Sequence, residues 1–260
     1  SWTAGYMQGT GVTRIGAGGS MTIGDNGNYK YLLSRKFENA GTVTWATPAY
    51  GTYLGDGAVI ENQAGGLFDA QTDSFIRFQS GAAPRFDNLG TFRKSAGAGT
   101  TSVDVVFNNL GGTVQVQSGT VSLTAGGASS GGTFTIGTGA VLGYDGGTHT
   151  LSGAYSVSGA GELRVSAGSA TFDPGGTANA VQLRVAGGTL VLQAMGAMTP
   201  TEVRVTGGAL SVAGPMTVSG VFDQTGGVLD GPGTVTVTGT GSWTAGYMQG
   251  TGVTRIGAGG

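Results

Sequence analysis

The chain has 260 residues, of which 55 are glycine and only 10% are charged, and its formal net charge is −2. This balance leaves no cluster of basic side chains for nucleic acid or anionic lipid, so we expect no nucleic-acid partner. The absence of cysteine excludes disulfide bonds, cysteine-ligated zinc and a thiol nucleophile. Hydrophobic residues make up 38% of the chain, which is enough to bury a core and argues against disorder.

The first nineteen residues, 1–19, recur without a change as residues 242–260. Such a long identity indicates a unit of 241 residues followed by the start of an identical second unit. We therefore expect a window from a longer tandem array, whose identical units stack end to end and can also associate laterally. An array of this kind is more typical of a fibre or stalk than of an enzyme.

Short strands are predicted along almost the whole chain. Alternating apolar and small polar residues, as in 113–117, 120–124 and 133–136, are bounded by glycine-rich turns. No segment combines helical periodicity with caps, and 31–37 is the stretch least typical of a strand. No apolar run approaches the roughly 20 residues of a membrane span, so no span is expected in this segment.

A Phe-x-Asn pattern marks the irregular first half of the unit, residues 20–107 and just beyond. Its asparagines are Asn39, Asn88 and Asn109, with Asn62 in a looser version, and their separations are 23, 26 and 21 residues. Because an asparagine amide can bond to the backbone of a turn, we expect these residues to stack coil upon coil. The interpretation is a structural ladder rather than a ligand site.

The same region, 20–107, holds Trp45, most of the tyrosines and phenylalanines, and most of the charges. Two interpretations are open. In the favoured one, larger side chains fill the core of wider coils. In the other, aromatic and charged loops carry a binding function, as solenoid loops often do.

A repeat of 20 residues appears in the second half. Segments 163–165, 183–185 and 203–205 align with one another, and so do the residues that follow each of them. Twenty residues suit one coil of a three-sided solenoid. Strand alternation places Arg164, Arg184 and Arg204 outward in a column, with Glu162 and Glu202 two positions earlier on the same side. The favoured interpretation is a solvated ladder offset by these acids, and the alternative is a site for acidic glycans.

These patterns predict an all-β, right-handed parallel β-helix (β-solenoid) with about twelve coils of roughly 20 residues in the 241-residue unit. Residues 1–241 form one unit, irregular over 20–107 and regular over 108–241, and residues 242–260 begin the next identical unit. At a strand spacing of ~4.8 Å, twelve coils advance the fibre by ~58 Å.

Catalytic chemistry has little support in the sequence, and we assign no catalytic, cofactor-binding or metal-binding residues. His149 is the single histidine, and we expect it to face solvent. A polysaccharide-degrading enzyme remains an alternative, because Asp69, Asp73, Arg77 and Arg85 could approach one another in adjacent coils.

Two further alternatives rest on short motifs. Residues 25–28 resemble the start of a calcium loop but lack the later glutamate of a complete one. Thr234, Thr236 and Thr238 form an outward threonine row of the kind that orders water on ice-binding solenoids, but no such row recurs at coil spacing.

Taken together, the Phe-x-Asn motifs, the strand that opens at Gly159 and the run 111–127 resemble the passenger regions of bacterial surface exoproteins. The similarity is to filamentous-haemagglutinin-like adhesins and autotransporter passengers, and it covers essentially the whole chain. The resemblance implies a β-helix in an extracellular, cell-surface location. It also implies a structural, non-enzymatic role in adhesion, cell-cell joining or biofilm matrix, with a carbohydrate-binding adhesin as the alternative. A glycan or cell-surface ligand would then be a partner, and no cofactor is implied.

Overall fold

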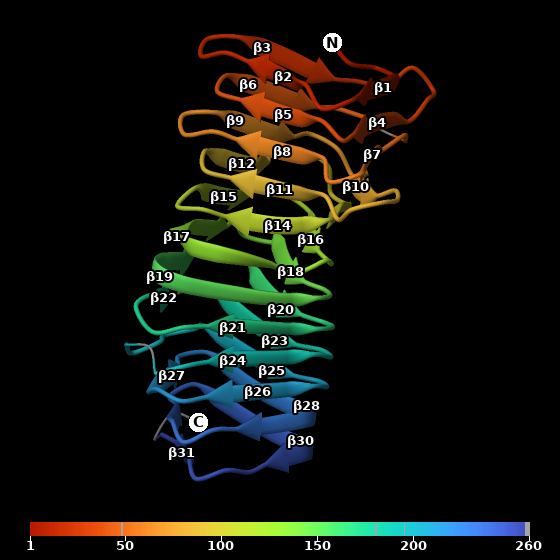
Figure 1. Cartoon of the computed structure of the whole chain (residues 1–260). Helices are drawn as coiled ribbons and strands as arrows, with labels where there is room; N and C mark the ends of the chain where they lie inside the picture. Colours follow the sequence, from red (N-terminus) through yellow and green to blue (C-terminus); the bar gives the residue numbers. More distant parts are fainter. Residues whose placement is uncertain (48, 180, 195, 258–260) are drawn as a thin grey trace.

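The computed structural model describes residues 1–47, 49–179, 181–194 and 196–257. Within these ranges the fold is all-β without a helix, and parallel strands stack into a solenoid of about 12 turns. Figure 1 shows the two ends of the chain at opposite ends of this stack. The predicted fold class is therefore confirmed, while residues 258–260 of the second copy of the duplicated segment lie outside the described residues.

Each coil presents three faces, which we name faces 1, 2 and 3 in the order in which the chain meets them. Long strands turn a corner and contribute to two faces. Face 1 is built from β1 (Gly5–Gln8), β4 (Lys30–Leu33), β7 (Thr52–Gly55), β10 (Phe75–Phe78), β13 (Thr100–Asp104), β16 (Thr120–Leu123), β18 (Val141–Tyr144), β20 (Glu162–Val165), β23 (Gln182–Val185), β25 (Glu202–Val205) and the first parts of β28 (Val221–Asp230) and β30 (Thr240–Met248).

The other two faces follow the same plan. Face 2 is built from β2 (Val12–Ile15), β5 (Lys36–Asn39), β8 (Val59–Asn62), β11 (Arg85–Asn88), β14 (Val106–Asn109), the first parts of β17 (Gly127–Ile136) and β19 (Thr148–Ser158), β21 (Ser169–Phe172), β24 (Thr189–Leu192), β26 (Ala209–Val212) and the second parts of β28 and β30. Face 3 is built from β3 (Ser20–Ile23), β6 (Thr42–Trp45), β9 (Leu67–Ala70), β12 (Thr91–Lys94), β15 (Thr113–Val116), the second parts of β17 and β19, β22 (Thr177–Ala178), β27 (Met216–Val218), β29 (Thr234–Val237) and β31 (Val253–Ile256).

Every pairing joins a strand to the same face of the next coil, so backbone hydrogen bonds run along the axis. The 20-residue repeat is reproduced in the register: Leu163 pairs with Leu183, which pairs with Val203. The arginine column is reproduced as well, since Arg164 pairs with Arg184 and Arg184 with Arg204.

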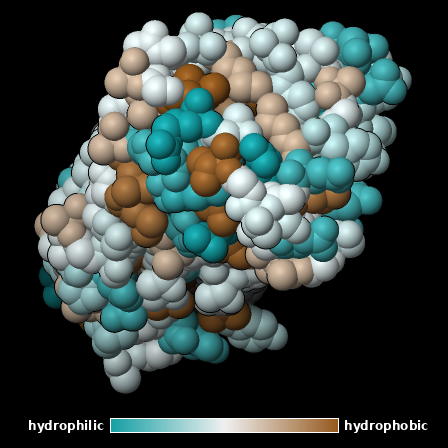
Figure 2. All heavy atoms as spheres, turned by 45° about the horizontal axis from the view of Figure 1, so that its top comes forward, coloured by the Kyte–Doolittle hydropathy of each residue, from teal (hydrophilic) through white to brown (hydrophobic). Residues whose placement is uncertain are grey.

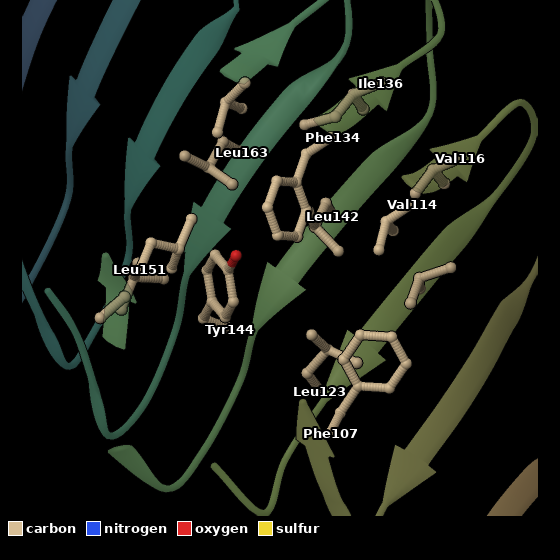
Figure 3. Close-up of a cluster of buried hydrophobic side chains, with 14 of the residues drawn as sticks. Phe107, Val114, Val116, Leu123, Phe134, Ile136, Leu142, Tyr144, Leu151 and Leu163 are labelled. Carbon is tan, nitrogen blue, oxygen red and sulfur yellow. The ribbon is translucent and has the colours of Figure 1, made fainter. Parts of the chain in front are cut away.

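The core is a continuous apolar column inside the coils. Alternate residues of each strand point inward, and Leu163, Leu183 and Val203 are at most 1% exposed. Figure 3 shows how side chains from neighbouring coils, such as Phe134 and Leu142, meet in this interior. Because each inward residue packs against the coils on both sides, the whole interior forms one hydrophobic cluster.

The large aromatic residues of the first half divide between inside and outside. Phe37, Trp45, Phe68 and Phe92 are at most 1% exposed and fill the interior. The tyrosines of β1, β4 and β7 instead point outward from face 1. The favoured interpretation is therefore confirmed for these phenylalanines and the tryptophan, whereas the tyrosines lie on the outer surface of the strands.

The asparagine ladder is confirmed. Asn39, Asn62, Asn88 and Asn109 are fully buried, and each Nδ2 donates to the next Oδ1, over 2.8, 2.8 and 2.7 Å. The same amides also donate to backbone carbonyls, as from Asn88 to Thr113 at 3.1 Å. The chain of bonds satisfies polar groups that would otherwise be unpaired at the corner between faces 2 and 3.

The glycine after each ladder asparagine allows the coils to approach closely at this corner. A Cβ atom at Gly90 would lie 2.3 Å from the carbonyl oxygen of Gly66, which belongs to the adjacent coil. Only glycine fits such a position, and the turn after each ladder asparagine supplies one, at Gly41, Gly66, Gly90 and Gly112.

Residues 31–37 form strands although their sequence is not typical of strands. This stretch was the least typical of a strand, yet it contributes to β4 and β5, separated by a corner at Ser34 with φ 55°. The alternation is obscured because Lys30, in line with inward Leu32, is itself fully buried.

Candidate functional site

The two end coils carry the features most directly related to assembly. The first copy of the duplicated segment places Trp2, Met7 and Ile15 inward, where Trp2 bridges Ile23 of the adjacent coil. Trp2 is 7% exposed. Since β3 packs against Trp2, and β4 and β5 pack against the rest of this segment, its apolar side chains are largely covered on that side.

The second copy has the same inward pattern at the other end of the stack. Trp243 pairs with Gln224, Met248 with Leu229 and Ile256 with Val237. These three partners in the preceding coil are buried. Trp243 is nevertheless 58% exposed and Ile256 55% exposed. The tryptophan and the isoleucine, with the same inward direction, are thus more covered at the first end than at the second, whereas Met7 and Met248 are partly buried at both ends.

A hollow opens in the interior at this uncovered end. Phe222, Trp243, Met248 and Ile256 line a cavity of about 280 Å³, which is open on one side. At the opposite end, which is brought forward in Figure 2, apolar side chains also lie among hydrophilic ones on the surface. Open strand edges next to uncovered apolar side chains form a surface suited to a further coil.

A second surface lies on face 1 of the first four coils, and we name it the tyrosine surface. Its centre is a stack in which Tyr6 lies 4.5 Å from Tyr31, and Tyr31 lies 5.5 Å from Tyr53, ring centre to ring centre. Tyr29 and Phe75 both pack edge-on against Tyr53. Tyr6 is 63% exposed, so aromatic rings and hydroxyl groups are displayed together to solvent.

Charges border this surface without forming a free charged cluster. The Arg77 guanidinium lies 4.3 Å from the centre of the Phe75 ring and donates to Asp104 over 2.9 Å. Burial and the neighbouring tyrosines Tyr6 and Tyr53 raise the pKa of Tyr31. The Tyr31 hydroxyl group therefore stays neutral at neutral pH.

The four residues considered for a polysaccharide-degrading site do not come together. Asp69 accepts two hydrogen bonds from Arg93, at 3.0 and 2.9 Å, and Asp73 pairs with Lys94 at 2.7 Å. Arg77 pairs with Asp104, and Arg85 pairs with Asp87 at 2.7 Å. Each group thus has a partner outside the predicted set, and the strands that carry Asp69, Arg77 and Arg85 belong to three different faces.

The arginine column differs from the expectation in its partners. Arg204 pairs with Glu202, as expected. Arg164 instead makes two hydrogen bonds to Asp145 of the preceding coil, at 3.1 and 2.7 Å. Although burial of Asp145 opposes ionisation, the hydrogen bonds from Arg164, Ser166 and Ser122 hold the pKa of this carboxyl below its usual value.

His149 was predicted to face solvent, and this was wrong. It is 3% exposed, its ring lies 4.8 Å from that of Tyr144, and its Nε2 lies 3.0 Å from the Gly146 carbonyl oxygen. His149 and inward Leu151 are two residues apart in one strand, so alternation places both inside. Burial lowers the pKa of His149, and hydrogen bonds to backbone groups offset this only in part.

This burial predicts a pH dependence of stability. Because the pKa of His149 is lowered in the folded state, the unfolded chain binds a proton more readily, with a pKa of ~6.5. The contribution of His149 is complete above this value and is lost as the pH falls through it. We expect the urea midpoint to fall between pH 7.5 and pH 5, and to fall less in His149→Phe. An equal fall in both proteins would contradict the assignment.

Two fully buried lysines were missed by the sequence reasoning. Lys30 donates to the Tyr50 carbonyl oxygen over 2.7 Å, and its burial lowers its pKa. Lys94 has four acceptors within 3.0 Å, among them Asp73 and Thr101. Lys30 is two residues from inward Leu32, and Lys94 is two residues from inward Phe92. This strand period could have predicted that both lysines point inward.

The motif considered for calcium has another role, and the threonine row considered for ice binding ends before the last coil. Asp25 accepts hydrogen bonds from the backbone of Gly27, Ala49 and Tyr50, so its carboxylate ties two loops together. Thr236 pairs with Thr217 on one side and with Arg255 on the other, so the threonine row does not extend into the last coil.

Among the described residues, no group of three or more His, Asp or Glu side chains is arranged to hold a metal ion. The described part of the chain also contains no helix long and apolar enough to cross a membrane. Comparisons of the chain with protein-family models, with curated proteins and with solved structures find no match.

Proposed function

We propose that the chain is the repeat unit of a structural rod, in which identical units stack end to end as one solenoid. The observation that carries the proposal is the duplicated segment. Its inward side chains are covered where a coil follows, as at Trp2, and exposed where none does, as at Trp243. The coil that covers Trp2 would cover Trp243 in the same way if a second unit followed.

The rod would work mechanically. Parallel ladders on three faces, a continuous apolar core and the asparagine ladder all run along the axis, so stress on one coil is shared with its neighbours. We place such a rod outside a bacterial cell, as the resemblance implies, where it would space the cell from its surroundings or join cells together. The tandem duplication favours a shaft over an isolated enzyme.

The proposal is tested by the length of the particle. Chains with one, two and three copies of residues 1–241, each ending in 242–260, would be compared by negative-stain electron microscopy. We expect rods of constant width that lengthen by about 55 Å per copy, which corresponds to between eleven and twelve strand spacings. Globules, or particles joined by bends at each copy, would contradict a continuous rod.

The tyrosine surface supports a second candidate function, the binding of glycans along the shaft. Tyrosine combines an apolar ring with a hydroxyl group, and such pairing suits the mixed polar and apolar surface of a sugar chain. The aligned, partly exposed rings of Tyr6, Tyr31 and Tyr53 offer a row rather than a single contact.

Affinity electrophoresis in gels that contain neutral or acidic polysaccharides tests this candidate. If a polysaccharide retards the chain, Tyr31→Ala with Tyr53→Ala is expected to weaken retardation at least about tenfold, because the row loses its centre. Tyr247→Ala is the matched control, since Tyr247 is 70% exposed at the other end of the stack. Absence of retardation by every polysaccharide, or an equal loss in the control, would reject this surface as a glycan site.

A further inference from the structure

The two copies of the duplicated segment lie on different faces of the solenoid. Trp2 pairs with the face 3 strand β3, whereas Trp243 lies on face 1 in β30. Met7 lies on face 1, but its counterpart Met248 lies on face 2. The third pair, Ile15 and Ile256, lies on faces 2 and 3. All three positions are displaced by one face in the same direction.

This displacement is not a slip in register. A slip by one residue would turn every side chain of a strand to the opposite side of the sheet. Instead, Met7 pairs with buried Leu32 and Met248 with buried Leu229, so both methionines point inward. Thr13 and Thr254 likewise pair with the inward residues Phe37 and Val235. The second copy repeats the whole pattern of the first, one face further around the axis.

The strand pairings fix the number of turns per unit. Face 1 can be followed from β1 through each coil to β30, and the other faces can be followed in the same way. From Trp2 to Trp243 the chain completes eleven turns and then crosses one additional face. A unit of 241 residues therefore contains a whole number of turns plus one third.

We infer that successive units of the array are rotated by one third of a turn about the fibre axis. This inference rests on the proposed end-to-end stacking and specifies the partner surface. The exposed edge of β30 and β31 would receive residues 20–23 of the next copy over Trp243, as β3 covers Trp2. Each unit would rise by ~54 Å and turn by ~120°, so that three units, or ~163 Å, return to the starting orientation.

The rotation determines the directions in which the tyrosine surfaces of successive units point. Without it, the tyrosine surface of every unit would lie along one side of the rod. With it, successive tyrosine surfaces point in three directions, and a rod of three units presents one toward every side. Lateral contacts through a single face would then recur only at every third unit.

Electron cryomicroscopy of a chain with three copies of residues 1–241 tests the inference. Because the three faces look alike at low resolution, each unit would carry a gold label on a cysteine introduced by Arg184→Cys. Arg184 is exposed, and the chain has no cysteine of its own. Leu89→Cys, at a site 38% exposed on another part of the coil, provides a second label in case the first disturbs folding.

We expect successive labels to be separated by ~54 Å along the axis and ~120° around it, with the same angle for both label sites. Labels in line along a straight rod, ~58 Å apart, would overturn the rotation while leaving the rod itself intact. Variable angles at each unit boundary would also overturn it, because they would show that the solenoid is interrupted. Particles without a rod would reject the proposed function together with the inference.

Discussion

Replacing Leu183 with aspartate is expected to destroy the resistance of the central coils to proteolysis. Leu183 is 1% exposed and lies between Leu163 and Val203 in the column of inward residues, with no basic side chain beside it in that column. A carboxylate there would be charged, unpaired and surrounded by apolar groups, which costs at least about 4 kcal/mol. Because coils support one another in sequence, the damage should spread to the neighbouring coils.

Limited proteolysis followed by mass spectrometry provides the measurement. Cleavage of Leu183→Asp should begin in the coils between residues 160 and 212. Arg184→Asp is the matched control, because it introduces the same residue at the next position, where the side chain is exposed between two other arginines. We expect this control to retain full resistance. Full resistance in Leu183→Asp would contradict the core assignment.

The second large effect is expected at the asparagine ladder. Asn88 accepts from Asn62 over 2.8 Å and donates to Asn109 over 2.7 Å and to the Thr113 carbonyl oxygen over 3.1 Å. Asn88→Ala removes the hydrogen bonds that Asn88 donates to the Asn109 Oδ1 atom and the Thr113 carbonyl oxygen, and each buried group left without its bond costs ~1–3 kcal/mol. We therefore expect a loss of about 3 kcal/mol or more in the stability of the surrounding coils.

Urea denaturation and hydrogen exchange would measure this loss. Asn28→Ala, at an exposed asparagine, is the control and should change the urea midpoint little. In Asn88→Ala the backbone amides of β11 and β14 should exchange faster than those of β25, which lies several coils away. An unchanged midpoint would show that the ladder contributes nothing to stability.

The ladder and the regular coils were predictable from the sequence because their determinants are local. Asn39, Asn62, Asn88 and Asn109 recur at separations close to one coil, and a stacked fold allows few alternatives for such a spacing. The column that begins at Leu163 was equally clear. In both cases, one residue type at one interval was sufficient to predict which residues are neighbours in space.

Other features could not be predicted in this way. The pairing of Arg164 with Asp145 depends on how one coil lies upon the preceding one. Glu162 is nearer to Arg164 in the sequence, so the sequence favoured Glu162 as its partner. The face on which Trp243 lies depends on the sum of all coil lengths, including irregular ones. His149 was a different case, because strict use of the two-residue strand period would have placed it beside Leu151.

Fluorescence quenching of tryptophan tests the central claim most directly. The chain has three tryptophans, of which Trp2 and Trp45 are buried and Trp243 is 58% exposed. Acrylamide and iodide quenching would be measured on chains with one, two and three copies of the unit. Continuous stacking predicts a single accessible tryptophan, in the final coil, whatever the number of copies. At each junction the tryptophan is Trp243 of one unit and Trp2 of the next. If such a junction tryptophan is accessible, the next unit does not cover it as β3 covers Trp2, and the account of a continuous solenoid is wrong.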